Sequence, residues 1–305
     1  MDRALRPLAG SLARLLGEPD LAEATLRLVR ERAPDERLAL AFLAKLAEAS
    51  PDSMAVILRD PARASDLVFC LGASELAGTG LATVSGDWAG FFERARVLTA
   101  EALLASIRFE HVGTGDAASS VRDLVAFKRR IFLEIVIADL LGRLTVSGTV
   151  AAMTRLADQC IGGALDIAKA ALGETARLAG DFCVVALGKL GASELNLSSD
   201  IDLMYIFGGP DDAEHQDAAR RLGERLTEIL SADCFRVDMR LRPGGRNSPL
   251  VISLETALGF YETLGQTWER AALLRARPVA GALGLGNRMI MELGRFIYRS
   301  YLDFD

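Results

Sequence analysis

Residues 183–207 read CVVALGKLGASELNLSSDIDLMYIF, and this stretch decides the expected fold of the chain. Its two ends, 183–187 and 201–207, are short runs of β-branched, aromatic and other apolar residues, which are typical of buried strands. A turn marked by glycines joins the two runs. Asp200 and Asp202 stand at the start of the second run. Because successive side chains of a strand point to opposite faces, we expect these carboxylates to share one face, roughly 7 Å apart.

Helices are expected on both sides of this stretch. A capping box at Ser120 and Asp123 predicts the start of a long helix, and further helices are expected at about 148–172 and between the second and third strands. The third strand is predicted at 234–243, where apolar and charged residues alternate. After it we expect the loop RPGGRNSPL and one helix over about 254–277.

The first 110 residues predict a helical region. They are rich in Ala, Leu and Arg, and apolar residues such as Leu38, Phe42 and Leu46 recur at helical spacing between Pro and Gly residues. The stretch HVGTGDAASS at 111–120 is typical of a linker. We therefore expect an α+β protein with two domains, a helical N-terminal region at 1–115 and a sheet-containing domain at 116–305.

The composition is that of an ordinary cytoplasmic protein. At 305 residues and 50% hydrophobic content the chain can bury a large core, and its formal charge of -6 argues against nucleic acid as a partner. Cys70, Cys160, Cys183 and Cys234 lie far apart in apolar surroundings, which predicts buried, reduced thiols. No apolar run approaches the roughly 20 residues of a membrane span and no signal peptide is visible, so we expect no membrane association.

A cluster of carboxylates is the first candidate for chemistry. Asp238 lies in the middle of the predicted third strand, so it joins Asp200 and Asp202 if that strand pairs with the second. Three carboxylates this close repel one another, and a divalent cation with hard oxygen ligands, Mg²⁺ or Mn²⁺, would compensate. Such cations suit phosphoryl or nucleotidyl transfer. The nearby turn supports this interpretation, because Gly188 lets backbone N–H groups approach phosphate oxygens and Lys189 supplies positive charge.

Simpler interpretations compete for the same residues. A D-x-D pair at a strand end is more often a solvated rim than a metal site, and Asp238 has Arg236 and Arg240 on its own strand as partners. The occurrence of turn, pair and third acid in one sheet favours the metal site. Arg240 and Arg242 belong to a set of arginines whose planar guanidinium groups suit phosphate contacts. The glycines of GALGLG at 281–286 predict a loop or helix break rather than a dinucleotide motif, because no buried strand is expected before them.

Three blocks occur in order along the chain: GKLGASELNLSSDIDLMYIF, FRVDMRLRPGGRNSPLV and YETLGQTWERAALLRARPVAG. Together they resemble the signature blocks of the glutamine synthetase adenylyltransferase/adenylyl-removing enzyme family, within the DNA polymerase beta-like nucleotidyltransferase superfamily. The resemblance covers about 120–305. It implies a nucleotidyltransferase-type mixed β-sheet with flanking helices behind a helical N-terminal lobe, and an enzyme that uses Mg²⁺ or Mn²⁺.

The resemblance also assigns roles to individual residues. Asp200 and Asp202 match the paired metal ligands of the superfamily and Asp238 matches its third carboxylate, so these three are the candidate catalytic residues. The candidate nucleotide- and phosphate-binding residues are Gly188, Lys189, Gly191, Ser199, Arg240 and Arg242. Lys189 stands where many relatives have Ser, which is a departure from the superfamily pattern.

The family enzyme has two such halves. One attaches AMP from ATP to a tyrosine of glutamine synthetase, and the other removes it by phosphorolysis, which yields ADP. The motif ELNLSSDIDL resembles that of the N-terminal half, which removes AMP, and its position about 200 residues from the start agrees with that half. The resemblance therefore implies removal of AMP from glutamine synthetase in the regulation of nitrogen assimilation. The implied partners are glutamine synthetase, nucleotide, phosphate and a PII-type signal protein.

One departure and three alternatives accompany this hypothesis. The family chain continues into further helix and a glycine-rich segment, K-x-G-x-G-G-I-R-x-I-E, that this sequence does not contain, so we expect a domain truncated at its C-terminal end. The first alternative is adenylyl transfer from ATP onto glutamine synthetase. The second is nucleotidyl transfer to a small molecule or an RNA end. The third is a catalytically silent docking or regulatory module.

Overall fold

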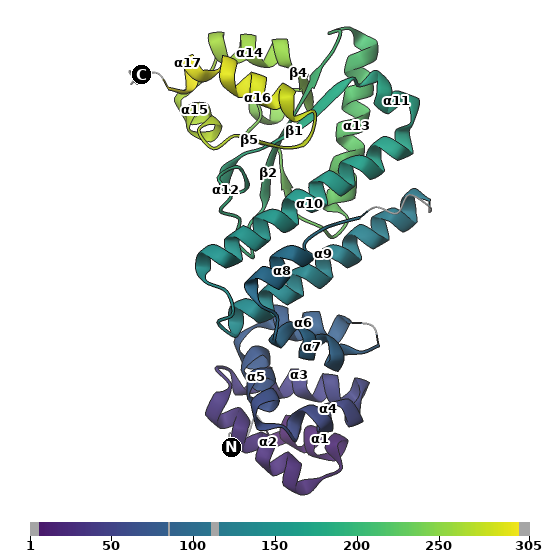
Figure 1. Ribbon diagram of the computed structural model, residues 1–305, viewed down its shortest axis with the longest axis vertical. Helices are drawn as coiled ribbons and strands as arrows, with labels where there is room; N and C mark the ends of the chain where they lie inside the picture. The colour runs from purple at the N-terminus through teal and green to yellow at the C-terminus, as the bar shows by residue number, and fades with distance from the viewer. Residues whose placement is uncertain (1–5, 85, 111–115, 299–305) are drawn as a thin grey trace. The chain divides into compact units, whose positions relative to one another are not determined.

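The computed structural model describes residues 6–84, 86–110 and 116–298 (Figure 1). These residues divide into two compact units, one made of the described residues up to 106 with 130–149, and the other of the described residues among 107–129 and from 150 onward. Helix α9 (Ala117–Leu140) and helix α10 (Val146–Leu172) contribute residues to both units. The α+β fold predicted from the sequence is confirmed, while the domain division at about residue 115 stays a prediction.

The regular elements among the described residues of the first unit are all helices. Its complete helices are α1 (Arg6–Leu16), α2 (Pro19–Arg32), α3 (Glu36–Ala49), α4 (Pro51–Leu58), α5 (Pro61–Ala73), α6 (Glu75–Thr83), α7 (Trp88–Arg96) and α8 (Ala100–Ser106). Helix α3 packs against α1, α4, α5 and α6, so its buried side is wide. Leu40, Leu43 and Leu46 are fully buried, whereas Leu38 and Phe42 of the predicted face are only partly buried.

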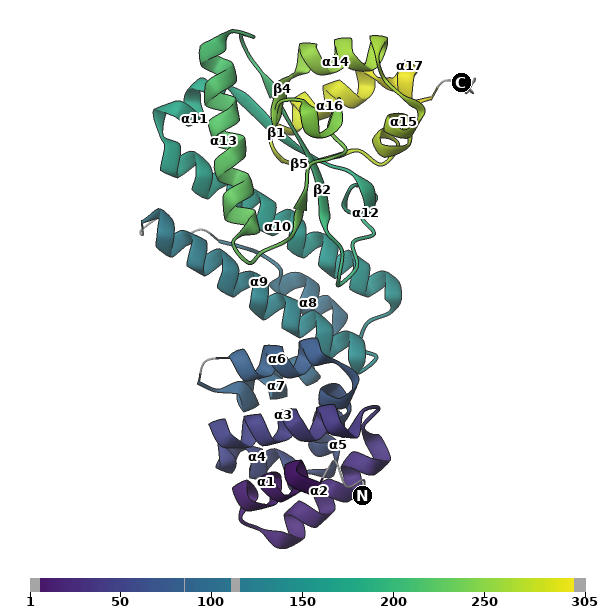
Figure 2. The same cartoon turned by 180° about the vertical axis from the view of Figure 1, so that it is seen from behind.

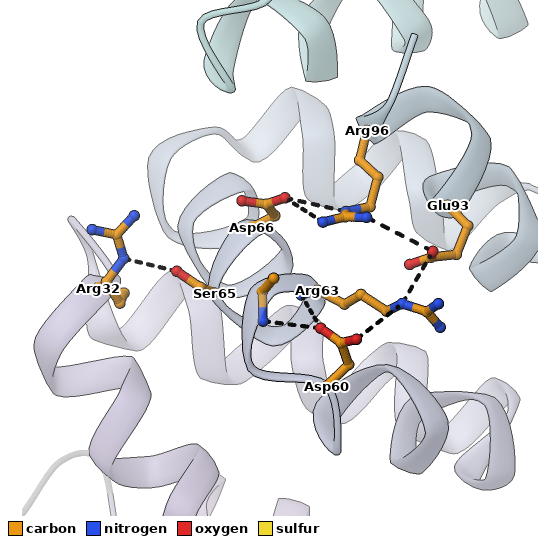
Figure 3. Close-up of polar contacts among 8 residues, drawn as sticks. Arg32, Asp60, Arg63, Ser65, Asp66, Glu93 and Arg96 are labelled. Carbon is orange, nitrogen blue, oxygen red and sulfur yellow. Dashed lines mark hydrogen bonds and ion pairs between the residues drawn. The ribbon is translucent and has the colours of Figure 1, made fainter.

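A row of alternating charges joins α5 to α7 in this unit (Figure 3). Arg96 donates to Asp66 Oδ2 through Nε and Nη2 at 3.1 and 2.9 Å, and Arg63 Nε lies 3.4 Å from Glu93 Oε2. Glu93 also lies 3.9 Å from Arg96, so each charge touches one of opposite sign. The Arg96 side chain is only 15% exposed, so water screens these pairs less than it screens an isolated surface pair.

The second unit is built on a mixed five-stranded sheet. Its strands are β1 (Asp181–Ala186), β2 (Ile201–Gly208), β3 (Val237–Asp238), β4 (Val251–Ser253) and β5 (Arg277–Gly281). The strand order is β3-β2-β1-β5, and β4 pairs with β2 beyond the end of β3. β1 is antiparallel to both β2 and β5, while β3 and β4 run parallel to β2.

Helices cover both faces of this sheet (Figures 1 and 2). On one face, Val185 of β1 and Met204 of β2 share a core with α14 (Leu254–Thr263), α16 (Leu283–Glu292) and α17 (Gly294–Ile297). The other face packs against α13 (Ala213–Ser231), where a Cβ on Gly223 would lie 3.1 Å from the ring of Tyr205. Burial on both faces explains why the strands read as continuous apolar runs. The remaining short helices are α11 (Glu174–Leu178), α12 (Gly188–Gly191), α15 (Thr267–Leu273) and the 3₁₀ turn η1 (Gly245–Asn247).

One strand prediction and one helix prediction were wrong in extent. The third strand spans only Val237–Asp238, because the carboxylate of Asp238 accepts the backbone N–H of Arg240 at 2.8 Å and turns the chain out of the sheet. The single helix predicted over 254–277 is two helices, α14 and α15, followed by β5. The break lies at Gln266, whose side chain caps the start of α15 in a capping box with Glu269.

Two smaller predictions also need correction. β5 ends at the first glycine of GALGLG, but only Ala280 of its five residues is buried, so no buried strand lies before this motif. In place of the predicted loop or helix break, α16 begins at Leu283 and contains Gly284 and Gly286. β5 is antiparallel to β1, so this strand and helix do not form the parallel unit of a dinucleotide site. Helix α9 begins at Ala117 rather than Ser120, and Asp116 caps it by accepting the N–H of Ser119 at 2.7 Å.

The cysteine prediction is confirmed. All four cysteines are buried free thiols. Within the described ranges, no helix is both long enough and apolar enough to cross a membrane.

Candidate active site

The candidate site begins where β1 ends and β2 starts. Helix α12 is a single turn that packs beside β2 in both views (Figures 1 and 2), and the backbone N–H of Leu187 donates to the carbonyl of Asp202 at 2.9 Å. Gly188 follows with φ of +55°, a conformation that favours glycine. A Cβ at this position would lie 2.2 Å from Asp202 Oδ2. Gly188 therefore leaves room for the carboxylate of Asp202, a reason for glycine that the sequence did not reveal.

The structure brings the three predicted carboxylates to one end of the sheet. In the parallel pairing of β2 with β3, Ile201 is opposite Val237 and Asp202 is opposite Asp238. The N–H of Ile201 donates to the carbonyl of Arg236 at 3.0 Å, which fixes this register. Asp200 lies two residues before Asp202, immediately ahead of the strand. Neighbouring strands are about 4.8 Å apart, so Asp202 and Asp238 are close neighbours.

The charges in this cluster are unevenly compensated. Burial raises the pKa of Asp202, and the charges of Asp238 and Asp200 raise it further. Hydrogen bonds from Arg240 lower the pKa of Asp238, whose two carboxylate oxygens lie 2.9 and 2.7 Å from Arg240 Nε. Asp200 forms a salt bridge of 2.6 Å to Arg236 Nε. Asp202 has no hydrogen bond or salt bridge through its carboxylate to any described residue.

A divalent cation fits this cluster by donor type. Carboxylate oxygens are the ligands that Mg²⁺ and Mn²⁺ prefer, and Gly188 keeps side-chain atoms away from Asp202. The ligand atoms are not gathered as a finished set, since the described part of the chain contains no group of three His, Cys, Asp or Glu side chains placed to hold a metal ion. Arg236 and Arg240 explain this, because each holds one of the carboxylates.

The glycine turn contributes differently from each of its positions. Lys189 is exposed, its Nζ lies 3.5 Å from Ser199 Oγ, and its charge acts to lower the pKa of Asp202 against the larger effect of burial. Ser199 donates to Asn196 Oδ1 at 2.6 Å. Gly191 is buried, and a Cβ there would lie 2.0 Å from the carbonyl oxygen of Arg275. Glycine is thus required at 191 for close packing of the backbone, whatever binds at the site.

The two predicted phosphate-binding arginines lie on the turn after β3. They border a pocket of about 350 Å³ that is lined by Asp200, Val237, Asp238, Met239, Arg240, Arg242 and Arg246. Arg242 donates to the backbone carbonyls of Met239 at 2.6 Å, Ser248 at 3.0 Å and Pro249 at 3.1 Å. Its guanidinium group therefore holds the RPGGRNSP turn together. Arg246 is exposed and lowers the pKa of Asp238 less than Arg240 does.

Sequence reasoning missed one buried acid that supports this turn. Glu269 is only 2% exposed, accepts the N–H of Gln266 at 2.9 Å and lies 3.4 Å from the N–H of Gly244. The spacing Q-x-x-E at 266–269 is the pattern of a capping box, so a signal was present in the sequence. The contact with Gly244 joins residues far apart in the chain and was visible only in the structure.

Other basic and aromatic residues near the motifs are engaged elsewhere. Arg277 donates to both oxygens of Asp158 at 2.9 and 3.0 Å and to the carbonyl of Leu190 at 3.0 Å. Arg275 pairs with Glu194 at 3.5 Å. Trp268 is 46% exposed, and its indole N–H donates to Gln266 Oε1 at 2.9 Å.

Comparison with known proteins agrees with the motifs. A family model described as glutamate-ammonia ligase adenylyltransferase matches residues 92–290. A bifunctional glutamine synthetase adenylyltransferase/adenylyl-removing enzyme from Streptomyces coelicolor is 36% identical over 312 residues, which covers 95% of this chain and 30% of that protein. Proteins with the same name from Hahella chejuensis and Mesorhizobium japonicum are 39% and 38% identical, over 60% and 67% of this chain and 21% and 23% of theirs. The chain thus spans between a fifth and a third of the length of these relatives.

Proposed function

Because the chain belongs to the glutamate-ammonia ligase adenylyltransferase family, we propose that it is a nucleotidyltransferase that removes AMP from an adenylylated tyrosine of glutamine synthetase by phosphorolysis. The names of its relatives include both the adding and the removing activity. The observation that carries the proposal is the register of β2 and β3, which sets Asp202 beside Asp238 next to the Gly188 turn. The proposal that the chain removes AMP, and does not add it, is based on the residues and the position of the ELNLSSDIDL motif.

In the proposed reaction an oxygen of inorganic phosphate attacks the phosphorus of the AMP group. The new P–O bond gives ADP, the bond from phosphorus to the tyrosine oxygen breaks, and the phenolate takes a proton from water. Mg²⁺ or Mn²⁺ bound at the acidic cluster would neutralise charge on the phosphoryl oxygens. Asp200, Asp202 and Asp238 would hold the cation. Phosphate is already an oxygen nucleophile, so the three carboxylates would serve only to hold the cation, and no side chain is needed as a base.

The cationic residues would orient the phosphate groups. Arg240 and Arg246 line the pocket beside Asp238, and Lys189 stands on the other side of Asp202 at the glycine turn. Arginine offers paired N–H donors that match phosphoryl oxygens, while lysine supplies a compact charge. Arg242 keeps the turn in shape through its carbonyl contacts, so its contribution to phosphate binding would be indirect.

The proposed partners follow from the same reaction. Glutamine synthetase would be the protein substrate, and phosphate and adenine nucleotide the small molecules. A PII-type signal protein is a further proposed partner, testable by co-purification with the chain. We propose a cytoplasmic location, since the four separate buried thiols are typical of a reducing compartment.

The test is to incubate this chain with adenylylated glutamine synthetase, Mg²⁺ and inorganic phosphate, and to measure ADP release. We expect release by the wild type, loss by about 10³-fold or more in Asp202→Asn because a cation ligand is removed, and no loss in Asp217→Asn, whose carboxylate pairs with Arg220 on α13. Incorporation of AMP from ATP without any ADP release would replace the removing direction with the adding one. No turnover in either direction would favour a silent docking module.

A further inference from the structure

The arginines of β3 and the turn after it compete for the oxygens that a cation would use. Arg240 contacts both carboxylate oxygens of Asp238 and also receives the attraction of Asp202 and Asp200, so one guanidinium group serves three carboxylates. Arg236 holds Asp200 through a single contact of 2.6 Å. Asp202, between them, has no such partner among the described residues.

This arrangement cannot persist when a divalent cation binds the same oxygens. A guanidinium group and a divalent cation on one carboxylate repel each other, and Arg240 already contacts both oxygens of Asp238 with its side chain and one of them with its backbone N–H. Arg240 can move, because its side chain is 60% exposed and borders the open pocket. Arg242 cannot follow it, since three backbone carbonyls hold its guanidinium group.

We propose that Arg240 is a phosphate-binding residue that moves from Asp238 to a phosphoryl oxygen when a divalent cation binds the acidic cluster. The cation would then release the arginine that binds the phosphate, and the phosphate would stabilise the arginine position that leaves the carboxylates free. Cation and phosphate would bind with positive cooperativity, and by linkage each would strengthen the other by the same factor. This inference rests on the proposed function of the acidic cluster.

The test measures binding of Mn²⁺ to the whole chain from the electron paramagnetic resonance signal of free Mn²⁺, with and without inorganic phosphate. For the wild type we expect phosphate to tighten Mn²⁺ binding about tenfold. Arg240→Gln should bind Mn²⁺ about three- to tenfold more tightly than the wild type without phosphate, because the competing ion pair is gone. The same variant should lose the enhancement by phosphate.

The matched control is Arg288→Gln on α16. It also removes one arginine that pairs with a carboxylate, Glu292 at 2.6 Å, but it does not line the pocket of the acidic cluster. This variant should bind Mn²⁺ and respond to phosphate like the wild type. It controls for the loss of one positive charge away from the acidic cluster.

The outcomes separate this inference from the function on which it rests. If Mn²⁺ binds, if Asp202→Asn weakens that binding, and if Arg240→Gln still behaves like the wild type with and without phosphate, the arginine exchange is wrong and the cation site stands. If the wild type binds no Mn²⁺, or if Asp202→Asn binds it unchanged, both the exchange and the proposed cation site are wrong.

Discussion

Replacement of Gly188 by alanine should destabilise the protein and displace the carboxylate of Asp202. Gly188 has φ of +55°, which costs a residue with a Cβ about 1–2 kcal/mol. The new Cβ would lie 2.2 Å from Asp202 Oδ2 and 3.1 Å from its Cγ, so the carboxylate must rotate at a cost of about 0.5–1.5 kcal/mol. Alanine also restricts the unfolded chain, which offsets about 0.4–1 kcal/mol. We expect a net loss of about 0.5–3 kcal/mol.

A double-mutant cycle separates the two contributions. In an Asp202→Ala background the carboxylate is absent, so Gly188→Ala should cost only the backbone part. The interaction energy between the two changes should therefore be about 0.5–1.5 kcal/mol. The unfolding free energies come from urea titrations followed by circular dichroism. Binding of Mn²⁺ to Gly188→Ala should also weaken, because Asp202 no longer lies in its wild-type position.

The control is Gly162→Ala on α10, where a new Cβ meets no atom within 4 Å. Alanine is the better helix former, so this change should stabilise the protein by about 0.5–1 kcal/mol. Opposite signs for two glycine-to-alanine changes would be hard to explain by a general effect. If Gly188→Ala is as stable as the wild type, or if its cost is the same with and without the Asp202 side chain, the argument for glycine at 188 fails.

Three further predictions concern packing and charge. Arg96→Leu should lower the unfolding free energy by about 1–3 kcal/mol, because Asp66 and Glu93 lose a shielded partner. Arg59→Leu removes an exposed pair with Glu18 and should cost less than about 1 kcal/mol. Equal losses of unfolding free energy in urea titrations of the two variants would contradict this difference. Burial raises the pKa of Glu134 above its ordinary 4.5, so the stability that this group contributes is present below that value and is lost as pH rises through the folded pKa. The melting temperature of Glu134→Gln relative to the wild type should therefore increase between about pH 4 and about pH 7, and a constant difference would refute the assignment. Gly191→Ala places a Cβ 2.0 Å from the carbonyl oxygen of Arg275 and 2.7 Å from that of Ala186. It should therefore lower the unfolding free energy by more than about 3 kcal/mol. A melting temperature near that of the wild type would show that the backbone moves to make room for the Cβ.

The sequence alone determined the parts of the protein whose signals are local. The paired runs at 183–187 and 201–207 became β1 and β2, and the periodic segments became α10 and α13. A strand or helix that buries a continuous surface repeats its apolar pattern along the chain, so the pattern can be read without knowing the neighbours. The same reasoning predicted that Asp200 and Asp202 stand together, because their spacing is a property of one strand.

Only the tertiary structure decided the rest. β3, β4 and β5 have two, three and five residues, too few to show a period, and pairing with β1 or β2 defines them as strands. The register that sets Asp238 beside Asp202, the pairing of Arg236 with Asp200 and the closeness of Gly188 to Asp202 depend on contacts between separate segments, whereas Arg240 contacts Asp238 only two residues away. Those contacts form where strand pairing and packing bring separate segments together, and no single stretch of sequence contains that information.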